Sequence, residues 1–355
     1  MTLLRGVVAL ALGFTSLTAN ADHATAGPVG NAPIVVTTAA DVIDEHDGVL
    51  SLREAVILAS DQAGDDEIQL PEARYELTLG CDVPETEDPS AQVPESGDLD
   101  HSGGNLRIVG AGELGGSTIS GACGGGAQNR VLDNRSEWIR LRDVVLSDGR
   151  DEFGGAIRTD RSVEFIGGGV IDSSASGPGG GVYAANGVDL IGATIRDNVA
   201  AGSGGGISAG RIDAENAEIV DNSAGLSGGG IDGRWARLEL TRLVGNTVDP
   251  SLSSEPHRAT GGGGASTRET LYAMRTTIAG NRVLGEMRDG GGGGGVRAGA
   301  TWIQDSTVSG NQVANGSGGG VLQVTPEPPD HTGSGLFIYT ATISGNSVAS
   351  GIGGG

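Results

Sequence analysis

The chain has 355 residues, of which 66 are glycine and 12 proline, and its formal net charge is −23. The apolar share of 37% argues against a disordered chain, and the lack of glycine at every third position excludes collagen. So acidic a chain repels the phosphate backbones of nucleic acids and anionic membrane surfaces, so we expect neither as a partner. The lack of any lysine excludes Schiff-base chemistry.

Residues 1–21 are typical of a signal peptide. Arg5 precedes a short apolar stretch, and the small-residue sequence Ala19-Asn20-Ala21 forms a cleavage site before Asp22. No later segment reaches the roughly 18 apolar residues of a membrane span. We therefore expect an exported protein, secreted or held at the cell surface, with no transmembrane segment after the signal is removed.

Residues 33–105 are predicted to form an N-terminal cap that includes the first strands. Ser51 and Glu54 have the spacing of a capping box, in which each side chain bonds the backbone amide of the other residue. This predicts a helix that runs to about Ser60. The first coil of a solenoid would expose its core and its strand edges, so we expect this helix to cover the open end.

The two cysteines, Cys81 and Cys123, flank the start of the repeats. An oxidising compartment would favour a disulfide between them, whereas two separate free thiols are the alternative. Their spacing is not that of a metal site. The sequence alone leaves the pairing open.

Residues 106–355 contain a repeat with undisturbed spacings of 24 and 25 residues, in which an asparagine precedes a glycine triplet. Short alternating strands at such a period predict an all-β parallel β-helix solenoid of ~24-residue coils. Earlier copies have Gly149 and Ser173 in the asparagine position. The asparagines, which we expect to form a hydrogen-bonded ladder, are Asn198, Asn222, Asn246, Asn281, Asn311 and Asn346.

Three sets of apolar residues keep a fixed place in the repeat, and stacked coils would turn each set into a buried column. The set three residues before the asparagine is Leu146, Val170, Ile195, Ile219, Leu243, Ile278, Val308 and Ile343. The set eight residues before it is Phe165, Leu190, Ala214, Leu238, Ala273, Ile303 and Ile338. The set that follows the glycines is Ile157, Val182, Ile207, Ile231, Ala265, Val296 and Val321.

Two long insertions follow Asn246 and Asn281, and both fall at the same turn of the coil. A third, residues 325–335, falls at another turn. Insertions that cluster on one face often mark a binding face, whereas tolerated surface variation is the alternative. His257 and His331 lie in these loops.

Aspartates precede the asparagine position in four successive copies, at Asp148, Asp172, Asp197 and Asp221. Stacked coils would place these carboxylates about 5 Å apart. Oxygen-rich clusters suit calcium, so we hypothesise a ridge that binds Ca²⁺ weakly. The alternative is a solvated acidic edge with arginines nearby. No other cofactor is expected.

The sequence Ser51-Leu52-Arg53-Glu54-Ala55 resembles the CSLREA-domain family of secreted bacterial β-helix proteins. The similarity continues through residues 65–79 and 105–121 and into the repeats, which also resemble those of polymorphic outer-membrane proteins and adhesins. Leu50 stands where that family has a cysteine, so a family disulfide in the cap is lost or moved. The resemblance implies an exported surface protein with right-handed coils, but it implies no reaction.

The function we expect is therefore a non-enzymatic, adhesin-like scaffold that binds a polysaccharide or a surface protein. The alternative is a polysaccharide lyase or glycoside hydrolase acting on acidic polysaccharide, since neighbouring coils can bring two carboxylates into a suitable range. No catalytic residue is assigned, because we find no hydrolase motif and the five histidines are scattered. The sequence also stops inside a repeat, from which we expect a truncated product or an end covered by another chain through end-to-end association.

Overall fold

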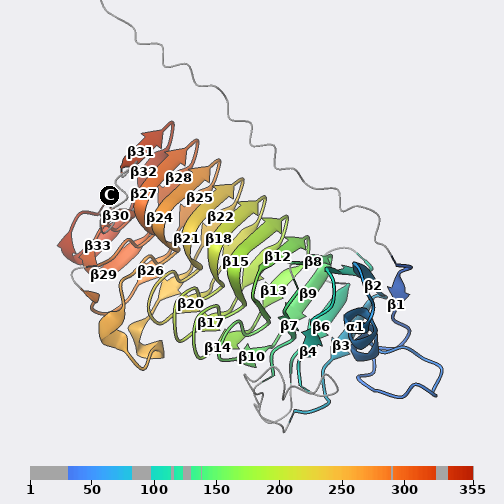
Figure 1. The fold of residues 1–355 in the computed structure, drawn as a ribbon. Helices are drawn as coiled ribbons and strands as arrows, with labels where there is room; N and C mark the ends of the chain where they lie inside the picture. Colours follow the sequence, from blue (N-terminus) through green and yellow to red (C-terminus); the bar gives the residue numbers. More distant parts are fainter. Residues whose placement is uncertain are drawn as a thin grey trace, which may run out of the picture.

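The computed structural model describes residues 31–81, 97–112, 116–122, 129–136, 138–288, 291–324 and 335–354. The predicted signal peptide, Cys123, His331 and nearly all of the third insertion lie outside these residues. Within them the chain winds into stacked coils whose strands form three long parallel sheets along one axis (Figure 1). The predicted parallel β-helix solenoid is confirmed.

Sheet A has 15 strands in the described part of the chain, and its early coils contribute two short strands where later coils contribute one long strand. Its strands are β1 (Ile34–Val35), β2 (Asp66–Leu70), β4 (Leu99–His101), β5 (Leu106–Gly110), β7 (Leu132–Asn134), β8 (Trp138–Arg142), β11 (Ile157–Thr159), β12 (Ser162–Ile166), β15 (Val182–Ile191), β18 (Ile207–Glu215), β21 (Ile231–Glu239), β24 (Ala265–Met274), β27 (Val296–Gln304), β30 (Val321–Gln323) and β31 (Leu336–Tyr339).

Sheets B and C close each coil with shorter strands, 10 and 8 in the described residues. Sheet B consists of β3 (Ala73–Glu76), β6 (Ser117–Ser120), β9 (Val144–Ser147), β13 (Gly169–Ile171), β16 (Thr194–Arg196), β19 (Glu218–Val220), β22 (Arg242–Val244), β25 (Thr277–Ala279), β28 (Thr307–Ser309) and β32 (Thr342–Ser344). Sheet C consists of β10 (Arg150–Asp151), β14 (Ser174–Ala175), β17 (Val199–Ala200), β20 (Ser223–Ala224), β23 (Thr247–Val248), β26 (Arg282–Val283), β29 (Gln312–Ser317) and β33 (Ser347–Ile352).

The strand register confirms all three predicted apolar columns. Phe165 pairs with Leu190, Leu190 with Ala214, and the series continues in register to Ile338. Most members have no exposed surface, while Ile338 in β31 is 42% exposed. The columns therefore form one continuous core inside the sheets, because every coil buries the same positions against the next.

The asparagine ladder is also confirmed. Each side-chain amide donates to the amide oxygen of the next rung at 2.9 to 3.1 Å, from Asn198 to Asn346. The same oxygen accepts the backbone N–H of the preceding asparagine. Rungs Asn198 to Asn311 are fully buried, so these bonds satisfy polar groups that water cannot reach.

The glycine triplet has a separate cause at each position, as residues 179–181 show. Gly179 has φ +73°, a left-handed conformation that favours glycine. A Cβ on Gly180 would lie 2.1 Å from the carbonyl oxygen of Gly205 in the next coil. A Cβ on Gly181 would lie 2.9 Å from Val170 Cγ1 and 3.0 Å from Asn198 Cγ. Close stacking of the turns against the ladder thus requires all three.

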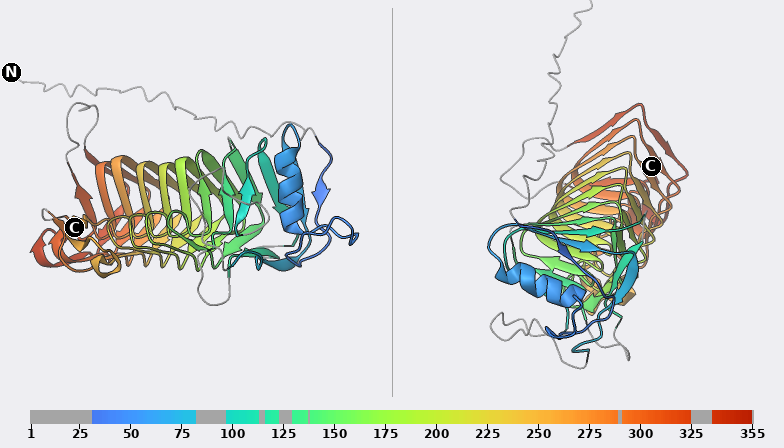
Figure 2. Two further views of the ribbon diagram at one scale, coloured as in Figure 1. Left: turned by 60° about the horizontal axis from the view of Figure 1, so that its bottom comes forward. Right: turned by 90° about the vertical axis from the view of Figure 1, so that its right-hand side faces the viewer.

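Helix α1 (Leu52–Asp61) covers the N-terminal end of the solenoid, as predicted (Figure 2). Both bonds of the capping box are present: Ser51 Oγ accepts the Glu54 amide at 3.1 Å, and Glu54 accepts the Ser51 amide at 2.8 Å. Arg53, 1% exposed, forms an ion pair with Asp41 at 2.7 Å and donates to the carbonyls of Gly97 and Asp98. The helix is therefore fastened to the first coils by polar bonds as well as by its apolar face.

The segment predicted as a cap, 33–105, shares its sheets with the repeats. β1, β2, β5 and β8 are consecutive neighbours in sheet A, and β3, β6 and β9 in sheet B. Cys81, just after β3, is disulfide-bonded, and Cys123 is the only other cysteine of the chain. Leu50, partly buried, packs against the core where the similar family has its cysteine.

Candidate binding site on the outer face of sheet C

Both described insertions leave the solenoid at sheet C and pack together, as expected from their common position (Figure 1, orange). The first insertion, residues 249–260, contains two 3-10 helices, η1 (Pro250–Leu252) and η2 (Pro256–Arg258). It folds back over the preceding coil, where Thr260 donates to the Leu226 carbonyl at 2.9 Å. Arg288 of the second insertion donates its amide to the Ala259 carbonyl at 2.7 Å. His257 is exposed on η2.

A cavity of about 320 Å³ lies between this insertion and sheet C. We call it the sheet C groove. It forms because the first residue of each two-residue strand points outward and the second is buried, so residues of β10, β14 and β17 present a row of outward side chains beneath η1. The residues that line the groove include Arg150, Asp151, Ser174, Ser176, Val199 and Leu252.

The two charged groups of the sheet C groove differ in their partners. Asp151 is 6% exposed and forms an ion pair with Arg130 at 2.9 Å. Arg150 is exposed, and among the described residues its guanidinium has no ion pair or hydrogen bond. The groove therefore offers one uncompensated cation, two serine hydroxyls and the apolar side chains of Val199 and Leu252.

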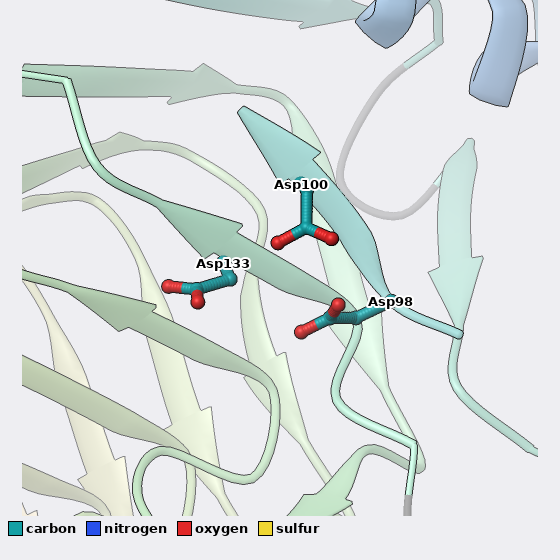
Figure 3. A group of neighbouring side chains, drawn as sticks. All are labelled: Asp98, Asp100 and Asp133. Carbon is teal, nitrogen blue, oxygen red and sulfur yellow. The ribbon is translucent and has the colours of Figure 1, made fainter. Parts of the chain in front are cut away.

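Beside the groove lies an acidic cluster, two of its three members buried, that the sequence did not predict (Figure 3). Carboxylate oxygens of Asp98, Asp100 and Asp133 lie within 4.8 Å of one another. Arg130, 2% exposed, lies 3.2 Å from Asp98 and 3.5 Å from Asp133. This guanidinium offsets part of the negative charge, and Arg135 adds a second contact to Asp133 at 3.1 Å, so a divalent cation would have to compete with both arginines. These ion pairs give the cluster a structural role, because Arg130 joins Asp98 to the neighbouring coil.

The four aspartates of the predicted calcium ridge do occupy equivalent places. The strand ends that precede them, from Ser147 to Val220, pair in register. All four have left-handed backbones, and glycines fill the same place in later coils. The φ values are +59°, +54°, +58° and +54° for Asp148, Asp172, Asp197 and Asp221, and +72°, +63°, +63° and +62° for Gly245, Gly280, Gly310 and Gly345. Aspartate and glycine both tolerate this conformation, which gives the column a local cause.

Two of the ridge carboxylates already have cationic partners. Asp148 accepts a bond from Arg74 at 2.9 Å, and Asp197 accepts one from Arg196 at 2.6 Å. Burial opposes ionisation of Asp148, but hydrogen bonds from Ser147, Arg74 and Ser120 outweigh it and lower the pKa of its carboxyl. Calcium binding at this ridge stays a prediction.

A further column, also missed from the sequence, follows the outer face of sheet A. It begins with charged residues and ends with three aromatic residues: Glu67, Arg107, Arg140, Glu164, Asp189, Asp213, Arg237, Tyr272, Trp302 and Phe337. The rings of Trp302 and Phe337 stack with centroids 3.9 Å apart at 15°. The faces of stacked rings contact one another, so the aromatic residues of this column stabilise the packing of neighbouring coils.

No protein-family model, no curated protein and no solved structure matched the chain. The resemblance to CSLREA-domain proteins and to polymorphic outer-membrane proteins therefore stays a prediction. No helix in the described ranges is long and apolar enough to cross a membrane.

Proposed function

We propose that this protein is an exported, non-enzymatic, adhesin-like scaffold that binds a glycan in the sheet C groove. The observation that carries this proposal is the cavity of about 320 Å³ beneath the first insertion. This volume is at the lower end of the range found for small-molecule binding pockets. Its hydroxyl, charged and apolar lining suits a sugar, which presents hydroxyl groups and apolar C–H faces together. Export is supported by the signal-like N-terminus and by the disulfide at Cys81.

Binding is better supported than hydrolysis at this groove. Glycoside hydrolases generally use two carboxyl groups, one on each side of the scissile bond. Among the described residues that line the groove, Asp151 is the carboxylate, and Arg130 holds it in an ion pair. A carboxylate bound in this way is poorly placed to donate a proton or attack a sugar. The polysaccharide-degrading alternative therefore has less support here than a binding role.

A glycan array followed by calorimetry on the best ligand tests the proposal, with Val199→Trp as the blocking variant. Val199 is 37% exposed and lines the groove, so an indole there should fill the cavity and abolish binding. Val35→Trp is the matched control, because Val35 is 48% exposed on β1, away from the groove. Release of reducing ends is measured in parallel. The proposal would be overturned if no glycan on the array bound the protein, or if the Val199→Trp variant still bound the ligand.

A further inference from the structure

We propose that the sheet C groove recognises a carboxylate-bearing sugar, a uronic acid unit of a glycan, and that Arg150 is the residue that binds the carboxylate. This inference rests on the proposed function and adds the class of ligand. Arg150 lines the groove, is exposed, and has no acidic partner among the described residues. A planar guanidinium with unused donors matches a carboxylate in a two-point hydrogen-bonded pair.

Asp148 and Asp151 do not neutralise Arg150 because they are bound elsewhere, and Glu152 forms no ion pair with Arg150 among the described residues. Asp148 pairs with Arg74 at 2.9 Å, and Asp151 pairs with Arg130 at 2.9 Å. Arg74 and Arg130 come from earlier coils, so it is the fold that pairs Asp148 and Asp151 with arginines other than Arg150. The fold therefore leaves the Arg150 guanidinium as an unpaired cation in the lining of the groove.

The overall charge of −23 does not rule out an anionic ligand. At physiological salt the Debye length is about 8 Å, so exposed carboxylates farther away are largely screened. A contact inside the groove is screened much less. The distant charges should slow the approach of a polyanion at low salt, while the local guanidinium decides which sugar is held.

The remaining groove residues select a sugar over a simple anion. Ser174 lies in register with Arg150 on the neighbouring strand, and Ser176 also lines the groove. Their hydroxyls can exchange hydrogen bonds with sugar hydroxyls. Val199 and Leu252 supply the apolar contact for the C–H face of a pyranose ring. A ligand that satisfies all of these groups carries a carboxylate, hydroxyls and an apolar face in one unit.

The test compares a linear trigalacturonate with its fully methyl-esterified form, by calorimetry in about 150 mM NaCl. The ester keeps the sugar and removes the charge. We expect the acid to bind at least about ten-fold more tightly to the native protein, since a charge-assisted pair is the stronger kind. Arg150→Met should lose this preference, and Arg150→Lys should keep part of it, because lysine retains the charge but not the two-point geometry.

Arg161→Met is the matched control, because Arg161 is also exposed but does not line the groove. It should bind as the native protein does, and circular dichroism should show that every variant is folded. Equal binding of acid and ester, or a preference that survives Arg150→Met, would overturn this inference and leave the proposed function standing. If neither sugar nor any arrayed glycan binds, the proposed function fails as well.

Discussion

At the residue scale, backbone conformation explains the choice of several side chains better than their chemistry does. The turn between sheets A and B repeats a left-handed position that Gly192 and Asn216 occupy at φ +62° and +52°. Later coils place Leu240 and Arg275 there at +51° and +50°. Side chains with a Cβ cost about 1–2 kcal/mol in this region, so these coils carry local strain. The sequence did not predict this, because the strained residues differ in type.

Leu240→Gly should therefore stabilise the protein by about 0.5–1 kcal/mol, since glycine relieves the left-handed strain but has more entropy to lose on folding. Leu240 is 46% exposed, so little packing is lost. Thermal and urea unfolding measure the change. The matched control is Leu58→Gly in helix α1, where Leu58 is 43% exposed in a right-handed backbone. There the same substitution should destabilise by about 1 kcal/mol, and a shift of the same sign in both variants would contradict the argument.

At the element scale, the features that could be predicted are those with a fixed period and a fixed residue type. The asparagine ladder and the apolar columns satisfy both conditions, and the capping box is local in sequence. The Arg130 cluster was missed because its partners, Asp98, Asp133 and Asp151, follow no common spacing. The groove could be placed only in part, because the insertions marked its edge but not the way in which Leu252 folds back over β17.

Asn246→Ala should destabilise the protein by roughly 3 kcal/mol, because it removes a rung in the middle of the ladder. The amide oxygen of Asn246 accepts from both the backbone N–H and the side-chain amide of Asn222 at 3.0 Å. The backbone N–H of Asn222 would be left buried without a partner, while its side-chain amide would keep only its bonds to the carbonyls of Ile195 and Val220. Urea unfolding gives the loss. Asn346→Ala is the control, because this rung is only partly buried and its loss should cost less stability. An equal loss in the free energy of unfolding for both variants would show that burial does not determine how much each rung contributes.

At the scale of the whole molecule, the strands of each coil pair with those of the neighbouring coils, so stability should be transmitted from coil to coil along the continuous core. The sheets run without interruption from β1 in the cap to the last described coils. Helix α1 and the Arg53–Asp41 ion pair stabilise one end, where the two side chains are 1% and 3% exposed. Such an end should open as a local unit before the middle of the solenoid does.

Arg53→Met tests this by hydrogen exchange followed by mass spectrometry. Removal of one partner of a buried ion pair costs about 3–5 kcal/mol, and Asp41 would keep its backbone bonds from Thr78 and Leu79 but lose its counter-charge. Exchange should rise in α1, β2 and β5 and stay unchanged in β24 and β27, several coils away.

The control is Arg242→Met, which removes an ion pair to Glu218 whose side chains are 57% and 45% exposed. Exposed pairs contribute about 0–1 kcal/mol, so exchange should stay close to that of the native protein in every coil. A rise of equal size from β2 to β27 in Arg53→Met would show that the solenoid opens as a single cooperative unit. In that case the cap would stabilise all coils together, including those that form the sheet C groove, and variants near α1 would weaken glycan binding without touching the ligand.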